Sequence, residues 1–450
     1  MEARDLLRLP EILQNVFEQL DSDGPSLFAV VQVNKTWFLN GIAVLWQKAN
    51  TDALAQVSEE RRQIYASCIH KLIFNGPGDE AYYMSFQDLV FTNLREVSID
   101  SYRPKNGHRP NLLPLLPPTL EEFSFYGGDL GFEVLDHLRT NCRRLRSILI
   151  DSPGSDITPT AFLNFLRSCP ILESLTFVVR MEHLLPPETI LHLFSRKNLR
   201  SLEISAMIKE DLLDQISATI DTPLPMIERL ILPITASAIP TMITLLEPRH
   251  SLRELSLSID GTTRDIFTHI SRLTSLEKLE LKFRQEAELS SRDLASLKQL
   301  TLLQKLSIVT DSWYGLNTSS IHAMDWTDTD FDAAISHMPR LRHLELQVQC
   351  PLFVAAVASL SHHCRSLETC EMPQIFNFNM WPDRDEIWFP NLQELWIGGF
   401  DNDGDDQNTQ NDPREFAAKL KAKCPRLQDL NVYSEDPYTE AVAAAFNALD

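Results

Sequence analysis

One six-residue pattern, apolar-x-x-apolar-x-apolar, returns along most of the chain and limits its possible folds more than any other feature. The copy that begins at Leu252 reads Leu-Arg-Glu-Leu-Ser-Leu. Thirteen further copies begin at Ile69, Leu94, Leu120, Leu145, Leu172, Leu199, Ile227, Leu276, Leu303, Leu341, Leu367, Leu392 and Leu427. Most neighbouring copies start 24 to 28 residues apart. The alternation at the end of each copy predicts a short strand with one buried and one solvated face.

A fixed period in this range is typical of leucine-rich repeats, in which strand, loop and helix follow one another. Amphipathic segments between the copies predict the returning helices, and Thr158-Pro159 and Asp412-Pro413 are typical helix starts. These helices are predicted over 132–139, 160–167, 188–194, 265–270, 292–297, 331–337, 353–360 and 413–421. The predicted fold is therefore an α/β solenoid of about 14 repeats over 68–436, with parallel strands on the concave face and helices on the convex face. Residues 437–450 are predicted to cap its end.

Residues 1–50 do not follow the repeat. Three short amphipathic helices are expected there, the first with Leu13, Val16, Phe17 and Leu20 on one face. A unit of this size buries little surface, so it is marginal without a partner. Residues 51–67 are predicted to form one helix that links this unit to the repeats.

The first fifty residues resemble the F-box motif. The resemblance rests on an ordered set of residues, namely Leu9-Pro10, Ile12, Leu20, Val33-Asn34-Lys35, Trp37 and Leu45-Trp46. It implies that the unit docks on the Skp adaptor, and through it on a cullin–RING ligase. The implied adaptor-binding residues are Leu9, Pro10, Ile12, Leu20, Val33, Trp37 and Trp46. A plain three-helix capping domain is the alternative interpretation.

An F-box followed by leucine-rich repeats is itself typical of the substrate receptors of SCF-type ubiquitin ligases. The resemblance implies a non-catalytic subunit that holds a substrate protein while other subunits transfer ubiquitin, so the chain would act by proximity. The alternative is a repeat scaffold that takes no part in ubiquitination or protein degradation.

The charge balance restricts the partners. Lys and Arg number 41 and Asp and Glu number 62, so the formal net charge is -21. A surface this acidic repels nucleic acid and anionic membranes, and neither is expected as a partner. The N-terminus lacks a signal-length apolar core, and the most apolar run, 352–360, is too short to span a membrane. A protein of the cytoplasm or nucleus is expected.

The seven cysteines follow the repeat and predict reduced core thiols. Four of them, Cys142, Cys169, Cys364 and Cys424, stand three residues before the first Leu of a copy. No CxxC pair supports zinc. Asp401-Asn402-Asp403-Gly404-Asp405-Asp406 resembles the start of a calcium loop, but its glycine is misplaced and a mobile acidic loop is the preferred interpretation. We therefore expect neither metal nor cofactor.

No phosphate-binding loop, zinc-protease or hydrolase motif is present, so an enzyme is not expected. A polyphosphate site would need clustered cations on the solvated strand positions. The mixture of Lys278 and Lys282 with Glu254, Glu280 and Glu345 disfavours one.

The substrate site is predicted near the C-terminal end of the repeats. Trp396 is a solvated strand position beside Glu394, and Tyr433 corresponds to it in the next strand. Lys278 and Lys282 mark a second candidate area on the middle strands. Further aromatic residues lie nearby in sequence, namely Phe376, Phe378, Trp381, Trp388, Phe389 and Phe400. The alternative is that the insertions within 311–330 and 398–411 fold over these rings and make a local core.

Overall fold

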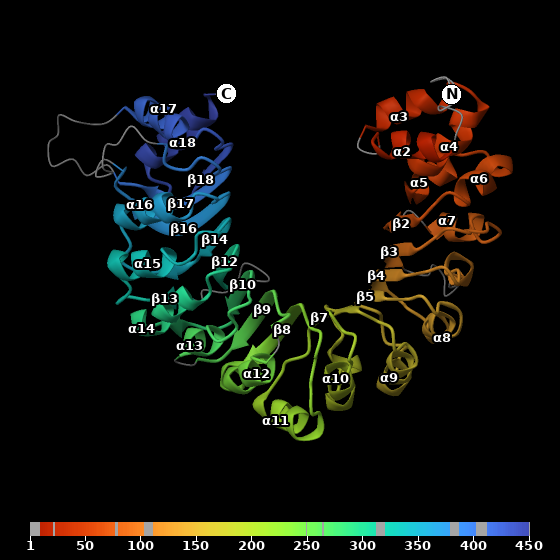
Figure 1. Cartoon of the computed structure of the whole chain (residues 1–450), viewed down its shortest axis with the longest axis horizontal. Coiled ribbons are helices and arrows are strands. Elements are labelled where there is room, and N and C mark those ends of the chain that lie inside the picture. The colour runs from red at the N-terminus through yellow and green to blue at the C-terminus, as the bar shows by residue number, and fades with distance from the viewer. Residues whose placement is uncertain are drawn as a thin grey trace. The chain divides into compact units, whose positions relative to one another are not determined.

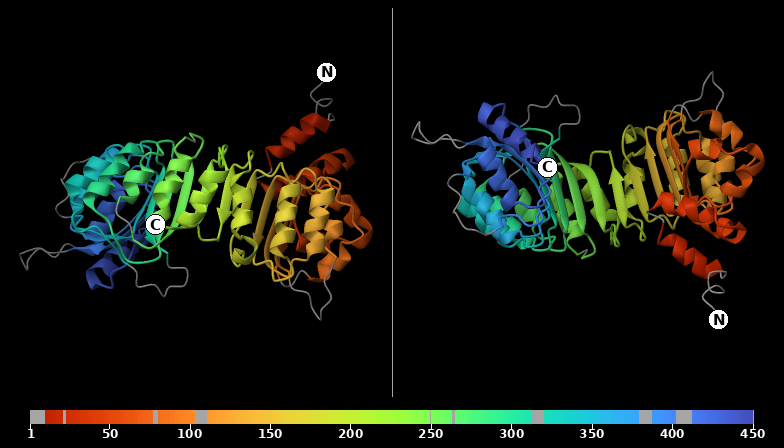
Figure 2. Two further views of the ribbon diagram at one scale, coloured as in Figure 1. Left: turned by 90° about the horizontal axis from the view of Figure 1, so that it is seen from below. Right: turned by 90° about the horizontal axis from the view of Figure 1, so that it is seen from above.

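The computed structural model divides the chain into two compact units, Met1–Ser205 and Ala206–Asp450, and each is described by itself. The structure describes residues 10–20, 23–76, 80–102, 111–248, 250–262, 265–311, 320–378, 387–401 and 412–449. In each unit, strands lie side by side in one layer and helices cover one face of that layer (Figures 1 and 2).

All fourteen copies of the pattern form strands, and each strand begins two residues after the first residue of its copy. The first unit contains β2 (Lys71–Asn75), β3 (Glu96–Tyr102), β4 (Glu122–Gly128), β5 (Ser147–Asp151), β6 (Ser174–Phe177) and β7 (Ser201–Ile204). The second contains β8 (Arg229–Thr235), β9 (Glu254–Asp260), β10 (Lys278–Phe283), β12 (Lys305–Thr310), β14 (His343–Leu346), β16 (Thr369–Phe376), β17 (Glu394–Phe400) and β18 (Asp429–Val432). The repeat prediction is confirmed.

Neighbouring strands pair in parallel and in register, so equivalent pattern positions align in rows. Leu279 of β10 pairs with Leu255 of β9 and with Leu306 of β12. These three leucines are 0 to 1% exposed. Along each strand, the residues on either side of such a leucine face the opposite side of the sheet, as period-2 alternation requires.

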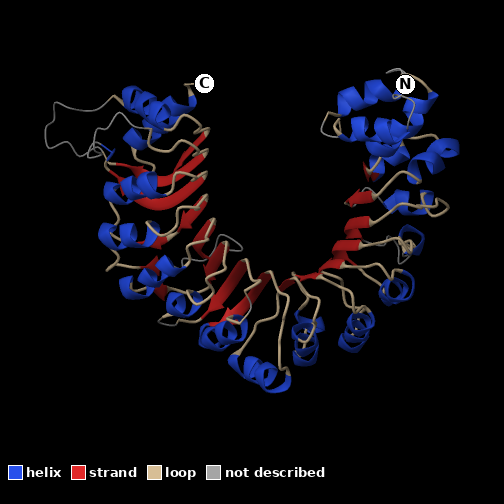
Figure 3. Cartoon of the chain, in the orientation of Figure 1, coloured by secondary structure: helices blue, strands red, loops and turns tan. Residues whose placement is uncertain are grey.

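The helices return the chain between strands and, within each unit, lie along one face of the strand layer (Figure 3). In the first unit they are α7 (Glu80–Ser85), α8 (Phe132–Asn141), α9 (Pro159–Ser168) and α10 (Pro187–Phe194). In the second they are α11 (Glu210–Thr219), α12 (Ile239–Leu246), α13 (Ile266–Ile270), α14 (Ser291–Leu294), α15 (Asp328–Ile335), α16 (Val354–His363), α17 (Pro413–Lys423) and α18 (Pro437–Asn447). Both predicted caps are present, because Thr158 accepts from the Ala161 amide and Asp412 accepts from the Arg414 amide.

From residue 10 onward, and leaving out residues 21–22, three helices precede the strands: α2 (Pro10–Glu18), α3 (Gly24–Val31) and α4 (Lys35–Leu45). Leu13, Phe17, Leu27 and Val44 form their core. The Trp37 ring packs edge-on against Phe17 at 5.7 Å between centroids. The helical unit therefore has a small core of its own.

The single helix predicted over 51–67 is wrong. The structure has a short strand β1 (Lys48–Asn50) that pairs with β2, then α5 (Thr51–Ala55) and α6 (Glu59–Ala66). Arg62 explains the break, because its guanidinium donates to the carbonyl oxygens of Ala55 and Val57, each at 2.9 Å. Ala55 is the last residue of α5 and Val57 lies in the turn that follows. The Arg62 side chain therefore satisfies carbonyl groups that backbone amides would satisfy in a continuous helix.

The four repeat cysteines occupy helix C-termini and are buried. The Cys142 thiol donates to the Pro117 carbonyl at 3.4 Å and the Cys364 thiol to the Met338 carbonyl at 3.5 Å, in each case one repeat back. Burial raises the pKa of both thiols to about 12. They are free thiols that join neighbouring repeats. Within the described ranges, no group of three or more His, Cys, Asp or Glu residues could hold a metal ion.

The first insertion does more than form a loop. Its described part contributes β13 (Ile321–His322) to a small parallel sheet with β11 (Ala287–Glu288) and β15 (Val348–Gln349). Trp326 is 1% exposed and packs against Phe331 of α15. Residues 312–319 and 402–411, which include most of the calcium-like sequence, lie outside the described residues.

Candidate functional site

The solvated positions of the second unit's strands form rows across the sheet, since the strands stay in register. One row contains Lys278, Lys305, His343, Thr369 and Glu394. The adjacent row contains Glu280, Ser307, Glu345, Glu371 and Trp396. The repeat thus displays side chains on a nearly regular grid.

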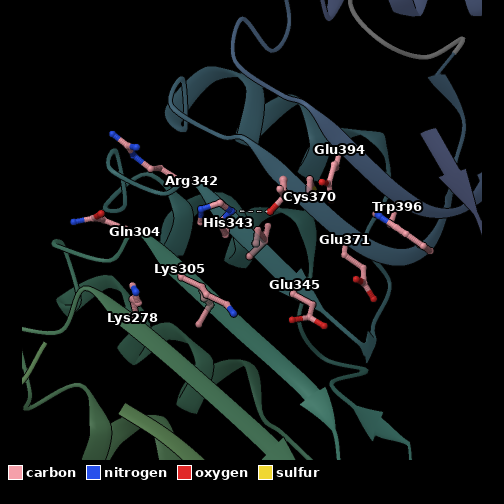
Figure 4. A pocket seen from close by; sticks show the side chains of 13 residues that line it. Lys278, Gln304, Lys305, Arg342, His343, Glu345, Cys370, Glu371, Glu394 and Trp396 are labelled. Atoms are coloured by element: carbon pink, nitrogen blue, oxygen red, sulfur yellow. Dashed lines mark hydrogen bonds between the residues drawn. The ribbon is translucent and has the colours of Figure 1, made fainter. Parts of the chain in front are cut away.

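A hollow of about 450 Å³ lies over these rows between β10 and β17. Figure 4 shows Lys278, Lys305 and Arg342 toward one side of it and Glu371 and Trp396 toward the other. Its further lining residues are Gln304, Leu306, His343, Leu344, Glu345, Thr369, Cys370 and Glu394. Three residues that the sequence singles out, Lys278, Glu394 and Trp396, therefore share one hollow.

The charges of the middle strands are paired among themselves. Lys278 lies 3.5 Å from Glu254, which also pairs with Arg229. Lys282 lies 3.2 Å from Glu280. Both predicted lysines are therefore engaged, and Lys282 does not line the hollow.

Glu280 is held as a carboxylate within this pairing. Burial alone would raise its pKa, but a hydrogen bond from Ser256 and the charges of Lys282 and Lys305 outweigh burial. The net effect lowers the pKa of Glu280. The middle strands therefore offer little unpaired charge to a ligand.

Trp396 and Tyr433 form an exposed aromatic pair at the other side of the hollow. The predicted correspondence of the two residues is wrong, because Trp396 pairs with Asn431 and Tyr433 follows β18 directly. They are 37% and 50% exposed, and their ring centroids lie 5.9 Å apart. The Tyr433 hydroxyl donates to Glu371 at 2.6 Å. Burial, this hydrogen bond and the charge of Glu371 raise the pKa of Tyr433, so its hydroxyl stays protonated and oriented.

The carboxylates beside the aromatic pair have neutral partners. Glu371 also accepts from the Gln347 amide at 3.1 Å, and Glu345 accepts from the Ser307 hydroxyl at 2.6 Å. Among the described residues, no ion pair joins Glu345, Glu371 or Glu394 to a cation. This part of the strand face therefore combines unneutralised negative charge with exposed aromatic surface.

The solvated positions of β14, β16, β17 and β18 carry no Lys or Arg. Their acidic residues are Glu345, Glu371, Glu394 and Asp429. His343 is half-buried, and burial together with nearby cations outweighs the charge of Glu368 and lowers the pKa of His343. His343 is therefore neutral at pH 7, and the face is acidic.

Most of the neighbouring aromatic residues are not surface groups. Phe376, Phe378, Trp388 and Phe400 are 0 to 5% exposed. Phe378 packs against Trp388, Phe400 and Phe416, with centroids 5.6 to 6.2 Å apart. These rings form a local core together with Phe416 of α17, while Trp381 and most of the second insertion lie outside the described residues. The surface role of Trp396 and Tyr433 stays a prediction.

The predicted adaptor-binding residues lie in different environments. Val33 is 59% exposed, whereas Leu20 and Trp37 pack partly against the helical core. Trp46 packs against Tyr65 of α6, with centroids 4.5 Å apart, and Ile12 is half-buried. Leu9 lies outside the described residues, and Pro10 begins α2.

Three exposed apolar residues of the helical unit are absent from the predicted adaptor-binding set, and one of them, Val16, was expected on the buried face of the first helix. Val16, Phe28 and Leu39 are 40%, 58% and 55% exposed. Phe28 could have been found from helical spacing, because Leu27 and Val31 of α3 are the buried i, i+4 pair and Phe28 lies off that stripe.

Parallel strands, one per repeat and joined in most repeats by a returning helix, define an α/β leucine-rich-repeat solenoid. No protein-family model and no curated protein matches the chain by sequence. An internalin from Listeria monocytogenes is similar in structure over 96% of this chain and 95% of its own, at 16% identity and a TM-score of 0.39.

Two further solved structures show the same kind of similarity. The Rad7–Elc1 complex in yeast matches at 14% identity over 96% of this chain and 94% of that chain, with a TM-score of 0.48. The leucine-rich-repeat protein LegL7 from Legionella pneumophila matches at 9% identity over 78% and 97%, with a TM-score of 0.30. At these identities the likeness concerns the fold alone. In the part of the chain that the structure describes, no helix is long and apolar enough to cross a bilayer.

Proposed function

We propose that this protein is the substrate-recognition subunit of an SCF-type ubiquitin ligase. Its N-terminal helices dock the Skp adaptor, and the solvated strand face of its repeats binds a substrate protein. The chain itself performs no catalytic step, because ubiquitin transfer belongs to the other subunits and requires only that the substrate be held close.

The observation that carries the proposal is the exposed apolar surface of the helical unit. Val16 in α2, Phe28 in α3, Val33 after α3 and Leu39 in α4 are 40 to 59% exposed. Small helical units rarely leave so many large apolar side chains in water unless a partner covers them. The same helices carry the residues on which the F-box resemblance rests.

The test is capture of purified Skp adaptor by the full-length chain. Phe28→Glu and Val33→Glu place a charge on the exposed surface without touching the core, so each should abolish capture. Trp37→Ala would be a poorer probe, because Trp37 packs against Phe17 and the variant would also loosen the unit.

Met226→Glu is the matched control, since Met226 is 43% exposed but belongs to the second unit. It should capture adaptor as the wild type does. If wild-type protein does not bind the adaptor, or if both charged variants bind normally, the chain is instead a repeat scaffold outside the ligase system.

A further inference from the structure

We propose that the solvated face of β14, β16, β17 and β18 recognises a cationic segment of the substrate, with a Lys or Arg side chain seated against Trp396 and Tyr433. This rests on the proposed function, because it names the chemistry of the substrate that the repeats bind. The face is an unpartnered sheet surface, and its charge determines which occupant fits it.

The aromatic pair supplies the first part of the argument. An isolated surface tryptophan needs no explanation, but Trp396 lies with Tyr433 at the edge of a hollow of about 450 Å³. A cation within about 6 Å of an aromatic centroid is attracted by the ring face, and Trp attracts it most. Because these rings are partly desolvated already, seating a guanidinium or ammonium over them removes little further water.

The carboxylates supply the second part. Glu371 is held against this pair by the Tyr433 hydroxyl and by the Gln347 amide, both neutral donors. Its negative charge is therefore positioned but not neutralised. Glu345 and Glu394 extend the same charge along the hollow. A cationic side chain would gain the ring faces and the carboxylates together, which is the complementarity that steers and selects partners.

The cations that line the hollow are less suited to bind an anionic ligand, because each is already paired with a carboxylate. Lys278 is paired with Glu254, Lys305 lies 4.0 Å from Glu280, and Arg342 lies 3.3 Å from Glu368. An anion would have to compete with these carboxylates. The net charge of -21 opposes it further.

The geometry also explains why the cation should belong to an extended segment. The carboxylates come from three successive strands, β14, β16 and β17. A chain laid across these strands passes Glu345 and Glu371 before it reaches Trp396. A single buried pocket for a free amino acid is not what the hollow provides.

The experiment measures fluorescence anisotropy of labelled peptides on full-length protein. The probe is a Gly/Ser peptide with Arg at every third position, and its matched partners carry citrulline or Glu instead. The Arg peptide should bind, and the citrulline and Glu peptides should bind at least tenfold more weakly. Affinity for the Arg peptide should also fall as salt rises.

Variants locate the site. Glu371→Gln keeps an acceptor for Tyr433 but removes the charge, and Trp396→Ala removes the ring; each should weaken Arg-peptide binding at least tenfold. Tyr126→Ala is the control, because Tyr126 is a 40% exposed tyrosine on β4 of the first unit, and it should bind normally. Should Trp396→Ala melt well below wild type, Glu394→Gln with Glu371→Gln decides the matter without altering packing.

Three results would overturn the inference. Equal binding of the citrulline peptide would remove the role of positive charge. Stronger binding of the Glu peptide would show that the hollow prefers anions. Normal binding by both Glu371→Gln and Trp396→Ala would place any peptide contact elsewhere. None of these depends on adaptor capture, so failure here is distinguishable from failure of the ligase assignment.

Discussion

Asp293 joins two neighbouring repeats through one buried carboxylate. It is 3% exposed, accepts from the backbone amides of Phe267 and Thr268, and also accepts from the Thr268 hydroxyl at 2.9 Å. These amides are unpaired donors at the start of α13. Asp265, which precedes the helix, has a φ of 70° and no side-chain cap of its own. The next repeat therefore provides the cap, which no local sequence signal would have indicated.

Replacing Asp293 by Ala should lower the free energy of unfolding by about 2 kcal/mol or more, because it leaves buried amides without an acceptor. Chemical denaturation of full-length protein measures this. Asp325→Ala is the control, since Asp325 caps Ser291 in the same way but is exposed, and it should cost less than about 1 kcal/mol. Equal losses of unfolding free energy in the two variants would show that the buried Asp293 cap contributes no more than an exposed one.

His192 gives the first unit a pH-dependent contact. Its Nε2 atom lies 3.2 Å from the guanidinium of Arg196, which also donates to the Leu166 carbonyl. Burial, with Arg196 and Arg167 nearby, lowers the pKa of His192. The unfolded chain therefore takes up this proton more readily than the folded chain. The stability contributed by neutral His192 is complete above its ordinary pKa of 6.5 and is lost as the pH falls below it.

The measurement is the melting temperature at pH 7.5 and at pH 5.5. Wild type should lose more between these pH values than His192→Gln, whose side chain does not titrate. An identical loss in the two proteins would show that other groups dominate the acid response.

At the scale of elements, the segments that follow the repeat could be predicted from sequence, and the segments that depart from it could not. All fourteen strands follow from the apolar pattern, because a buried strand position tolerates few alternatives. The break between α5 and α6 depends on Arg62 reaching back to two carbonyls, and β13 depends on pairing with distant segments. Local periodicity predicts neither the break between α5 and α6 nor the strand β13. The candidate site shows the same division: Trp396 and Glu394 follow from alternation, whereas the pairing that engages Lys278 and Lys282 depends on neighbours in other repeats.

Gly41 tests the packing of α3 against α4. A Cβ at this position would lie 2.7 Å from Cγ1 of Val31, and β-branched Val31 has little freedom to move away. Gly41→Val should destabilise the helical unit by about 1 to 3 kcal/mol through overpacking. Hydrogen exchange should speed up in α3 and α4 and stay unchanged in β9. Gly24→Ala is the control, because nothing lies within 4 Å of a Cβ at that position, and its amide hydrogens should exchange at wild-type rates. Wild-type protection of α3 and α4 in Gly41→Val would show that Gly41 does not pack closely against Val31.

At the scale of the whole molecule, α18 packs against β17 and β18, where the sequence predicts a cap. Phe446 and Val442 of α18 are 0 to 1% exposed, and Thr439 bonds to both the amide and the carbonyl of Phe400 in β17. A stack of repeats needs such a cap because its last repeat has no neighbour to cover it. The apolar face over 438–449 made this element predictable from sequence.

Removal of residues 437–450 should lower the melting temperature and cause self-association, visible by light scattering, because it uncovers the last repeat. Thr439→Val is a milder probe that keeps the shape and loses the hydrogen bonds; it should cost about 1 to 3 kcal/mol. Removal of 449–450 alone is the control and should leave the protein monodisperse. A monodisperse truncation with unchanged melting would mean that the helix does not act as a cap.

The register of the two strand rows fixes the spacing of their side chains, and this spacing has a consequence for any chain that crosses the rows. Paired strands lie about 4.8 Å apart, so alternate strands lie about 9.6 Å apart. A polyproline II chain rises about 3.1 Å per residue and returns to the same side after three residues, or about 9.3 Å. Glu345 of β14 and Trp396 of β17 stand two strands apart in one row. A ligand in this conformation would therefore bring every third side chain down over every second strand, so the substrate's own sequence should carry a three-residue rhythm set by the sheet.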